Sequence, residues 1–584
     1  MNYSESPLIK KIMKTIKSLT AFFVAIFFAS NLFAQHDFFT PQREQKKIPE
    51  LNATDDAKDK IILTLQTPQF PFETFSFKAT KNKPFTVNWG DGCIQTFICT
   101  NETSVTLKHP YNAAGEYTVT FEASDNNCRF LDFDSQPMFI NSWNIKDIEI
   151  KGCTALTAFT LLESSLTDII GLTECTALTI LHIFYNQLVN LDITNCTNLI
   201  DLACEHNELT NLDISNCPEL ERFNCSVNKL TNLDLSNCPK LVDLYCSENK
   251  LTNLDLSNCM KLEGLDCSKN ELTNLDLSNY MNFTYYIDCS YNKITNLVQP
   301  NCKNSIYEIH CSHNELTNLD LSNWTILQGL YCNNNKLINL DLSNCINLTD
   351  AIDVSNNELT TLDLSNCSKF KRLYCHHNKL TKINLTGCTT LSRIGCNNNQ
   401  LQLSDLFEIQ SIKKFSYLVL GEQHLLPQTA IMGAELFSEQ SIFDGIYTNY
   451  SITKDSIPAS ESDYTVEDGK LTFNAPGKYV VTMTNEAIGY GAKVIVPIEV
   501  QPVNIKKYAG TNIKVFPNPT NGQLTMDNGQ LTINSVEVFD IYGRKLFEDS
   551  NPYGLTVLRS YGLTAGHLFC KNRNRSRYYH KKNN

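Results

Sequence analysis

The amino-acid sequence predicts a mainly β protein, in which a solenoid of short stacked turns is flanked by small β-sandwich domains. Cysteines recur every 21 residues, as at Cys225, Cys246 and Cys267. Apolar and polar residues alternate within the repeats with the period of a strand, and helical periodicity is missing there. The flanking regions alternate in the same way around turns that contain glycine or proline. Since one short turn cannot bury its own apolar face, a fixed period of this length indicates turns stacked on one continuous core.

Length, charge and the lack of enzyme motifs limit the function. The 584 residues are too many for a single core, and the net charge of −13 argues against nucleic-acid partners, since phosphate contacts need clustered Lys and Arg. The sequence has no His-Glu-x-x-His, no Gly-x-Ser-x-Gly, no phosphate-binding loop and no dinucleotide fingerprint. We therefore predict no enzyme activity, no catalytic residues, no metal site and no cofactor.

The N-terminus carries the features of a secretory signal peptide, predicted at residues 1–34. Four lysines precede an apolar run at 19–29, which is too short to span a bilayer, and residues 32–34 offer a cleavage site before Gln35. A linker is predicted at 35–58. No later segment is a candidate transmembrane helix.

Residues 59–142 are predicted to form a β-sandwich. This region contains VNWGDG at 87–92 and HPYNAAGEYTVTF at 109–121, in which Tyr117, Val119 and Phe121 alternate as in a strand. The two motifs resemble those of the polycystic-kidney-disease (PKD) type β-sandwich found in many surface proteins. We interpret Asp91 as a turn residue and not as a catalytic acid. One disulfide is expected here, but the spacing does not choose the pair among Cys93, Cys99 and Cys128.

Residues 143–407 repeat the unit L-x-x-L-x-C-x-x-N-x-L-x-x-L-D-L-S-N-C-x-x about twelve times. Leu244 and Cys246 alternate with Asp243 and Tyr245, which predicts a short strand with one set of side chains inward. The second half of the unit repeats this spacing, so the opposite wall is expected to be extended as well. The unit resembles the leucine-rich repeat family, particularly its bacterial short-repeat, internalin-like members. That resemblance implies a protein-binding scaffold.

Two polar columns accompany the leucines. An asparagine follows each strand and is expected to turn the chain and to bond to the backbone, forming an internal ladder. This column comprises Asn207, Asn228, Asn249, Asn270, Asn292, Asn314, Asn335, Asn357, Asn378 and Asn399. The aspartates of the second half are expected to accept hydrogen bonds from turn amides, with calcium bridging as the alternative. They are Asp192, Asp213, Asp234, Asp255, Asp276, Asp320, Asp341 and Asp363.

Nineteen of the 23 cysteines lie in the repeats, at two fixed positions of the unit. Disulfides between neighbouring turns, zinc ligation and buried free thiols are the three alternatives. Stacked side chains project in parallel, which separates their Cβ atoms too far for a bridge, and no Cys-x2-Cys pair suggests zinc. Val354 and Trp324 replace cysteine at the two positions, so we favour buried free thiols that fill apolar slots.

One outward-facing position per strand, here called the strand row, varies while the frame stays fixed. It comprises His182, Ala203, Asn224, Tyr245, Asp266, Asp288, His310, Tyr331, Asp353, Tyr374 and Gly395. A varied row rich in Tyr and Asp on a concave face is suited to recognition, since aromatic anchors dominate interface energies; simple drift at solvent positions is the alternative. The candidate binding residues are Tyr245, Asp266, Asp288, His310, Tyr331, Asp353 and Tyr374. A metal site among the repeat histidines is less favoured than a solvated surface for His206, His310, His313, His376 and His377.

The region after the repeats is predicted to hold a cap and linker at 408–434 and an immunoglobulin-like β-sandwich at 435–503. The second assignment rests on DYTVEDGKLTFNAPGKYVVTMTN at 463–485, which alternates around Asp-Gly and Pro-Gly turns. A linker at 504–512 leads to the last module.

Residues 513–584 contain Phe516-Pro517-Asn518-Pro519 and Asp540-Ile541-Tyr542-Gly543, which are similar to motifs of the C-terminal sorting domain of type IX secretion substrates. The resemblance implies passage across an outer membrane and attachment at the cell surface. Beyond Ala565 the chain departs from the family pattern and ends in a basic tail. A shifted reading frame can restore the expected strand-turn-strand ending, so we hypothesise a frameshift near Ala565, which would leave the product periplasmic.

Together these features predict a non-enzymatic, secreted or cell-surface protein that mediates protein binding or adhesion. The expected partner is a protein, on a host or neighbouring cell surface, with a glycan as the chemical alternative. A passive structural spacer of the cell envelope is the second hypothesis.

Overall fold

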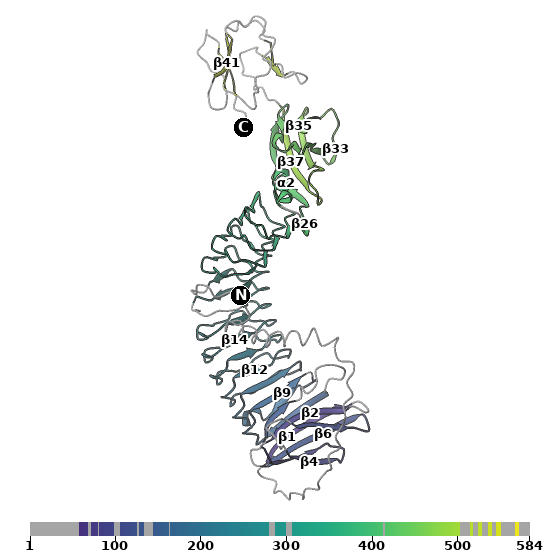
Figure 1. Ribbon diagram of the computed structural model, residues 1–584, viewed down its shortest axis with the longest axis vertical. Helices are drawn as coiled ribbons and strands as arrows, with labels where there is room; N and C mark the ends of the chain where they lie inside the picture. The colour runs from purple at the N-terminus through teal and green to yellow at the C-terminus, as the bar shows by residue number, and fades with distance from the viewer. Residues whose placement is uncertain are drawn as a thin grey trace, which may run out of the picture. The chain divides into compact units, whose positions relative to one another are not determined.

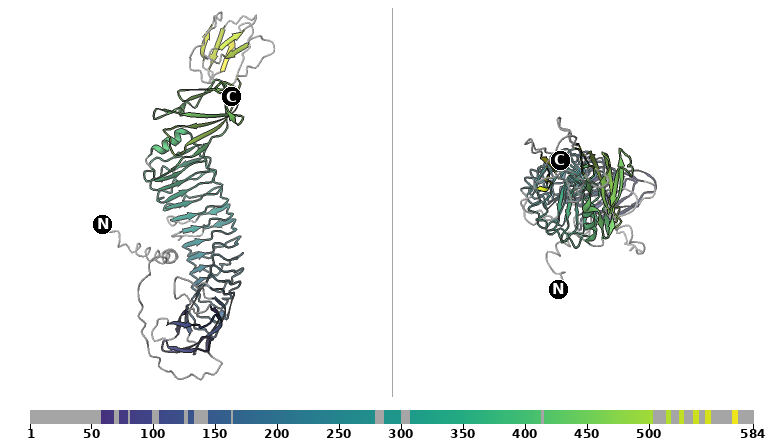
Figure 2. Two further views of the ribbon diagram at one scale, coloured as in Figure 1. Left: turned by 90° about the vertical axis from the view of Figure 1, so that its right-hand side faces the viewer. Right: turned by 90° about the horizontal axis from the view of Figure 1, so that it is seen from above.

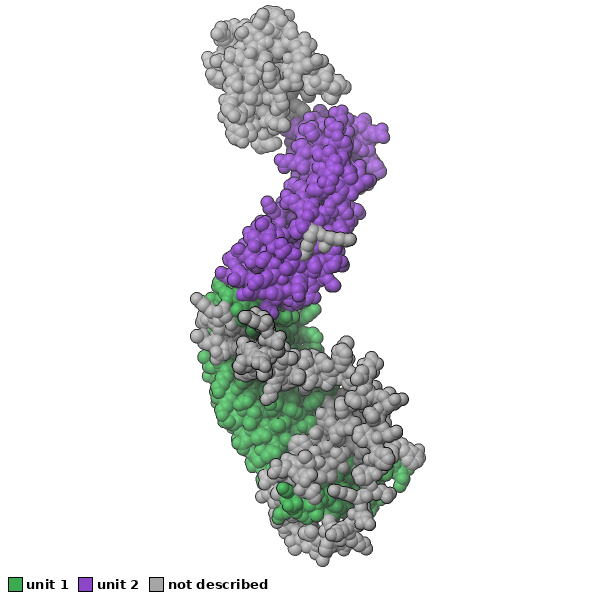
Figure 3. All heavy atoms as spheres, in the orientation of Figure 1, with its two compact units in different colours: residues 1–327 green, residues 328–584 purple. Residues whose placement is uncertain are grey.

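The computed structural model describes residues 58–67, 72–79, 81–98, 105–124, 128–132, 144–162, 164–278, 286–299, 307–412 and 415–502, and five strands between 514 and 571 (Figure 1). The predicted signal peptide and most of the first linker lie outside the described residues. The chain divides into two compact units, 1–327 and 328–584 (Figure 3). The protein is mainly β, with a β-solenoid of about 12 turns.

Unit 1 begins with a six-stranded sheet, which is antiparallel except for the parallel pair of β10 and β8. In sheet order the strands are β10 (Asp168–Ile170), β8 (Asn144–Lys151), β1 (Lys58–Thr67), β6 (Gly115–Ser124), β3 (Pro84–Asn88) and β4 (Ile94–Ile98). Alternate residues of β1 and β6 are buried, among them Leu63 and its partner Val119, as the sequence alternation predicts. The 3₁₀ helix η2 (Leu172–Glu174) follows β10.

A second sheet begins in the same region and continues into the repeats. Strands β5 (Val105–Pro110), β2 (Phe72–Ala79) and β7 (Cys128–Asp132) are antiparallel neighbours, and β7 then pairs in parallel with β9 (Ala158–Leu162). Strand β8, which follows the predicted domain boundary at 142, pairs with β1, which precedes it. The N-terminal region and the first repeat therefore share both sheets.

The solenoid of unit 1 is a parallel ladder in which each strand pairs in register with the next (Figure 1). After β9 come β11 (Ile180–Phe184), β12 (Asp201–Ala203), β13 (Arg222–Asn224), β14 (Asp243–Tyr245), β15 (Gly264–Asp266), β17 (Tyr286–Asp288) and β19 (Glu308–His310). The inward residues, such as Leu244 and Leu265, are fully buried. The opposite wall is extended, as predicted, and forms its own parallel pair, β16 (Asn274–Asp276) with β18 (Asn296–Val298).

Unit 2 contains the remaining turns, with strands β20 (Gly329–Tyr331), β21 (Ala351–Asp353), β23 (Arg372–Tyr374), β25 (Arg393–Gly395) and β26 (Tyr417–Val419). On the opposite wall β22 (Thr361–Asp363) pairs with β24 (Lys382–Asn384). Helix α2 (Leu403–Ser411) lies between the last two ladder strands in sequence and buries Leu403, Leu406 and Ile409.

A β-sandwich follows in unit 2 (Figure 2). One sheet contains β27 (Glu422–His424), β28 (Gln428–Ile431), β37 (Lys493–Gln501), β36 (Gly477–Thr484), β32 (Asn449–Lys454) and β33 (Ile457–Pro458), and the other β29 (Glu435–Leu436), β35 (Lys470–Phe473) and β34 (Tyr464–Glu467). Two small elements complete it, η3 (Ser438–Gln440) and the pair β30 (Ile442–Phe443) with β31 (Ile446–Tyr447). Gly469 has φ of 73°, and a Cβ there would lie 2.0 Å from the Ser441 carbonyl oxygen, which explains the Asp-Gly turn.

The C-terminal region contributes five described strands. Strands β38 (Lys514–Pro517) and β39 (Leu524–Asp527) pair, and β40 (Ser535–Phe539) lies between β41 (Lys545–Asp549) and β42 (His567–Lys571). Strand β42 lies beyond Ala565, where the frameshift is hypothesised, and pairs with β40 over its full length. In the part of the chain that the structure describes, no helix is both long and apolar enough to cross a bilayer.

Candidate binding surface on the solenoid strands

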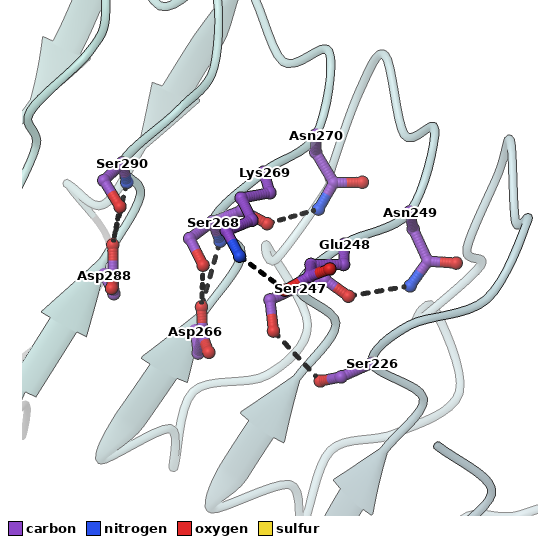
Figure 4. A network of polar contacts seen from close by, with 10 residues as sticks. All are labelled: Ser226, Ser247, Glu248, Asn249, Asp266, Ser268, Lys269, Asn270, Asp288 and Ser290. Carbon is purple, nitrogen blue, oxygen red and sulfur yellow. Dashed lines mark hydrogen bonds and ion pairs between the residues drawn. The ribbon is translucent and has the colours of Figure 1, made fainter. Parts of the chain in front are cut away.

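The asparagine column holds neighbouring turns together. Figure 4 shows the bonds that Asn249 and Asn270 make to serines of their own turns. The Asn249 Oδ1 atom accepts from the Leu230 N–H of the previous turn at 2.9 Å. Its Nδ2 donates to the carbonyls of Cys225, Cys246 and Ser247 at 2.9, 3.2 and 3.3 Å. Equivalent donor bonds to their own and the preceding turn are made by Asn207, Asn228, Asn270, Asn292, Asn314, Asn357, Asn378 and Asn399. The predicted internal ladder is confirmed.

The asparagines do not themselves turn the chain, and that part of the prediction is wrong. The residue before each one adopts the left-handed conformation, with φ of 53° at Glu248 and 52° at Lys269. The asparagine must point inward to make its four bonds, so the chain reverses one residue earlier. The same conformation recurs at Tyr185, His206, Val227, Tyr291, His313, Asn334, Asn356, His377 and Asn398.

The aspartate column on the opposite wall bonds to turn amides, as predicted. The Asp255 Oδ1 atom accepts from the Ser257 N–H at 2.9 Å. Bonds from that N–H and from the Ser257 hydroxyl lower the pKa of Asp255. The same backbone bond is made at Asp192, Asp213, Asp234, Asp276, Asp320, Asp341 and Asp363. Among the described residues, no group of three or more His, Cys, Asp or Glu side chains is placed to hold a metal ion.

The repeat cysteines are core residues, as the spacing predicts. The described cysteines of the repeats are all buried, and their thiols are free. Burial raises the pKa of Cys259 to about 12, and its Sγ lies 3.9 Å from the Leu235 carbonyl oxygen. These thiols therefore act as small apolar side chains and not as nucleophiles.

The strand row forms two registered series, one in each unit. In unit 1, Tyr245, Asp266, Asp288 and His310 are paired positions on four successive strands. In unit 2, Tyr331, Asp353 and Tyr374 are paired in the same way. Paired residues of neighbouring strands lie about 4.8 Å apart. All seven candidate side chains are half-buried, between inward neighbours that are fully buried.

Three carboxylates of the row are engaged by their own turn, and Figure 4 shows two of them, Asp266 and Asp288. The Asp266 Oδ1 atom accepts from the Ser268 N–H at 3.0 Å and from its hydroxyl at 2.7 Å. Asp288 and Asp353 accept in the same way from the serines two residues later. The Asp-x-Ser spacing is shared with the aspartate column, so this signal was present in the sequence. The Oδ2 atom of Asp288 also accepts from the Tyr286 hydroxyl, at 3.5 Å.

The flanking position of each strand adds charged side chains that sequence reasoning missed. In unit 1, burial and the nearby Glu263 carboxylate raise the pKa of Asp243 to about 6. Burial, followed by the charges of Asp243 and Asp266, raises the pKa of Tyr245 to about 12. The His310 Nε2 atom lies 3.4 Å from Glu308 Oε2. This stretch of strand face is therefore predominantly acidic.

The row in unit 2 has a different polar neighbourhood. The Tyr331 hydroxyl donates to Asp350 Oδ2 at 3.3 Å. The Arg372 Nη2 atom contacts both oxygens of the same carboxylate, at 2.5 and 2.6 Å. One aspartate thus fixes an aromatic side chain of β20 and a cationic side chain of β23, the two strands on either side of β21.

Glu205 is a further residue that the sequence did not single out. Its side chain is only 6% exposed, and within the described part of the chain its Oε2 atom has no hydrogen-bond partner. Nearby, Asp201 is 3.2 Å from His182 Nε2 and 2.7 Å from Arg222 Nη2. Burial raises the pKa of Glu205 to about 7.

Two of the repeat histidines stack on tyrosines of neighbouring turns. His206 stacks on Tyr185 and His313 on Tyr291, each with ring centroids 4.0 Å apart. These pairs occupy equivalent positions of neighbouring turns, where the left-handed backbone brings the rings side by side.

Solved structures with a similar arrangement share little sequence with this chain. The functional domain of InlJ from Listeria monocytogenes, which includes a cysteine ladder, aligns with a TM-score of 0.42 and 23% identity over 61% of this chain and 89% of that chain. The internalin InlF of Listeria monocytogenes gives 0.41 and 22% over 47% and 81%. YopM from Yersinia enterocolitica gives 0.35 and 22% over 45% and 60%. No curated protein matches the sequence.

The C-terminal region matches a family model by sequence. The match is to the secretion system C-terminal sorting domain and spans residues 514–582. It extends through the residues after Ala565. A sorting domain of this kind indicates secretion or display at the cell surface, and the C-terminal region of the chain is similar to that family.

Proposed function

We propose that this protein is a non-enzymatic, exported protein that binds a protein ligand through the strand row. The observation that carries the proposal is the contrast within each turn: invariant hydrogen bonds of Asn249 and its equivalents hold the frame, while the row in register with Tyr245 changes from strand to strand. A rigid scaffold with variable, half-buried Tyr and Asp side chains supplies anchors at low entropic cost. The sorting-domain match supports export.

The layout that goes with this proposal retains the predicted modules. A signal peptide at 1–34 precedes a PKD-type sandwich at 59–142, the solenoid at 143–407 and a cap and linker at 408–434, whose strands β27 and β28 pair with β37. An immunoglobulin-like sandwich at 435–503 and the sorting domain at 513–584 follow. The sandwiches act as spacers, and the solenoid presents a concave face to a host or neighbouring cell in adhesion. Tyr245, Asp266, Asp288, His310, Tyr331, Asp353 and Tyr374 are the proposed contact residues.

The test compares two sets of tyrosine substitutions in the full chain. Tyr245→Ala, Tyr331→Ala and Tyr374→Ala together are expected to reduce binding to target cells at least tenfold, since each removes an anchor worth about 1 kcal/mol or more. Tyr447→Ala with Tyr490→Ala, which change exposed tyrosines of the sandwich, is the matched control and is expected to bind normally. Wild-type binding by the triple variant, with circular dichroism unchanged, would contradict the proposal.

The same cell-binding assay distinguishes a protein ligand from a glycan. Treating the target cells with protease should abolish binding to a protein ligand. If periodate abolishes binding and protease does not, the ligand is the glycan alternative.

A spacer function is the second candidate, and one observation favours it. The Oδ1 atoms of Asp266, Asp288 and Asp353 are committed to serines of their own turns, as in the aspartate column. These aspartates therefore contribute to the frame. A spacer predicts that neither tyrosine set changes any binding, and that shortening the solenoid by whole turns alters only the reach of the protein.

A further inference from the structure

Arg393 is a cationic side chain on the strand face of unit 2 whose charge has no partner. It is exposed at the first position of β25, and among the described residues its guanidinium makes no hydrogen bond or ion pair. In the strand register it lies between Arg372 of β23 and Tyr417 of β26. The charge of Arg372, by contrast, is offset by Asp350, whose two carboxylate oxygens it contacts. Two arginines therefore occupy paired positions of neighbouring strands, and one of them lacks an anionic partner.

The strands around Arg393 carry no acidic side chain. The charged residues at 371–376, 392–397 and 415–421, which contain β23, β25 and β26, are all basic. The carboxylates of the preceding turn, Asp350 and Asp353, are already engaged by an arginine and by a serine. The whole chain, in comparison, has a net charge of −13. A basic stretch of strand face in an acidic protein is suited to an anionic ligand group, and paired like charges are less unfavourable when an anion lies between them.

The row position that follows Arg393 is a glycine. Gly395 is buried, and a Cβ there would lie 3.8 Å from the Tyr374 Cδ1 atom, so the Tyr374 ring lies beside a backbone without a side chain. Strand alternation places Arg393 and Gly395 on the same face of β25. A ligand side chain that reaches Arg393 can therefore pack its methylene groups on Gly395 and against the Tyr374 ring. Tyr417, which is 51% exposed, borders Arg393 on the other side.

We propose that Arg393 binds the carboxylate of an aspartate or glutamate side chain of the protein partner, while Tyr374 and Gly395 contact the methylene part of that side chain. This inference deepens the proposed function and rests on it, because it adds a charged contact to the tyrosine anchors of the strand row. A guanidinium group matches a carboxylate with two parallel hydrogen bonds, and the neighbouring Arg372 adds a second positive charge. Arg393 lies outside the strand row and was not among its candidate residues.

The direct test measures binding of a labelled acidic peptide to the full chain. The probe is fluorescein-labelled octaglutamate, with octaglutamine as the uncharged control, and fluorescence anisotropy at low and at physiological ionic strength gives the affinities. Since the chain is acidic overall, non-specific binding of an anionic peptide is disfavoured. We expect octaglutamate to bind the wild type more tightly than octaglutamine, and Arg393→Gln to weaken its binding at least about fivefold. Lys382→Gln, which removes the same charge from an exposed position on the opposite wall, is the matched control and should bind as the wild type does.

Two results with the peptides would overturn the proposal: equal affinity of the wild type for octaglutamate and octaglutamine, or equal affinity of Arg393→Gln and Lys382→Gln for octaglutamate. Arg393→Lys keeps the charge and loses the forked geometry, so its affinity should lie between those of the wild type and Arg393→Gln. This variant also serves if the glutamine variant fails to fold, which circular dichroism reports. Inorganic phosphate identifies another anion: if it displaces octaglutamate and acetate at equal ionic strength does not, the carboxylate assignment is wrong.

Binding to target cells separates this proposal from the proposed function. Arg393→Gln should weaken cell binding at least about fivefold, and Lys382→Gln should leave it unchanged. If the triple tyrosine variant loses cell binding and Arg393→Gln binds as the wild type does, the strand row binds the partner and the role of Arg393 in that contact is wrong. If neither variant changes cell binding but Arg393→Gln still loses octaglutamate, the carboxylate site is confirmed and the proposed function of the row fails.

Discussion

The asparagine column and the strand row recur with the same spacing, yet one is uniform and the other varied. Asn249 satisfies four backbone groups of two turns, and a side chain without an amide could not replace it. Tyr245 pairs with Asp266 in the strand register, and this backbone pairing does not require a particular side chain, so the residue can differ from strand to strand. The obligation to satisfy buried backbone groups therefore decides which positions of the repeat can carry recognition.

The largest expected effect comes from breaking the column. Asn249→Ala should lower the free energy of unfolding by about 4 kcal/mol, because it leaves the Leu230 N–H and several carbonyls buried without their bonds. Urea-induced unfolding followed by circular dichroism measures the loss. Asn249→Asp, which keeps the acceptor and removes the donors, is the control. Its free energy of unfolding should lie between those of the wild type and the alanine variant. A loss below about 1 kcal/mol for the alanine variant would contradict the role of the column.

Glu205 gives the next largest effect, with a defined pH dependence. The pKa of Glu205 in the folded protein is about 7, against an ordinary value of 4.5, so the folded state binds the proton more tightly than the unfolded state. The free energy of unfolding should therefore fall as pH rises from about 4.5 to about 7, by roughly 3 kcal/mol. Glu205→Gln should remove this fall, stabilising the protein at pH 8 and changing little at pH 4.

Comparing the free energies of unfolding of the wild type and Glu205→Gln at pH 4 and pH 8 measures the effect of ionising Glu205. Equal stabilisation by Glu205→Gln at pH 4 and pH 8 would show that shape, and not ionisation, controls the site. Glu248→Gln, at an exposed position two turns further along the solenoid, is the control and should leave the pH profile unchanged.

The frame was largely predictable from sequence because it depends on local periodicity. The 21-residue spacing predicted that Leu244 and Cys246 point inward, that Asn249 bonds to the backbone and that Asp255 caps a turn. Features set by contacts between distant segments were not predictable. The spacing gave no sign that Glu205 would be buried beside Asp201, that β7 would pair with β9, or that β27 and β28 would join the sandwich from a stretch predicted as cap and linker. The left-handed residue was misplaced by one position, because the sequence shows which residue bonds and not which dihedral changes.

The aspartate column should respond far less than the asparagine column. Asp255→Ala removes one bond to the Ser257 N–H at an exposed turn, where water replaces the lost partner, so a loss of about 0.5 kcal/mol is expected. The pKa of Asp255 is lowered in the folded state, so its small contribution is present above the unfolded pKa and is lost as the pH falls through the folded pKa. Thermal unfolding at pH 7 and pH 3 checks both statements. A loss of several kcal/mol would mean that this wall also holds the turns together.

The smallest effect on stability, and the sharpest test of the comparison, is Asp266→Asn. The amide keeps an Oδ1 acceptor for Ser268 and removes a charge whose ionisation is disfavoured by burial and by Asp288, as the raised pKa of Asp266 shows. Stability at pH 7 should change by no more than about 0.5 kcal/mol. If the row is a recognition surface for a cationic patch, ligand binding should nevertheless weaken and lose part of its salt dependence, which titration at two ionic strengths measures. Ser268→Ala is the control, because it removes the hydroxyl bond to the Asp266 carboxylate and keeps the charge of that carboxylate. If Asp266 serves only to stabilise the solenoid, Ser268→Ala should lower the stability more than Asp266→Asn, and neither substitution should change ligand binding.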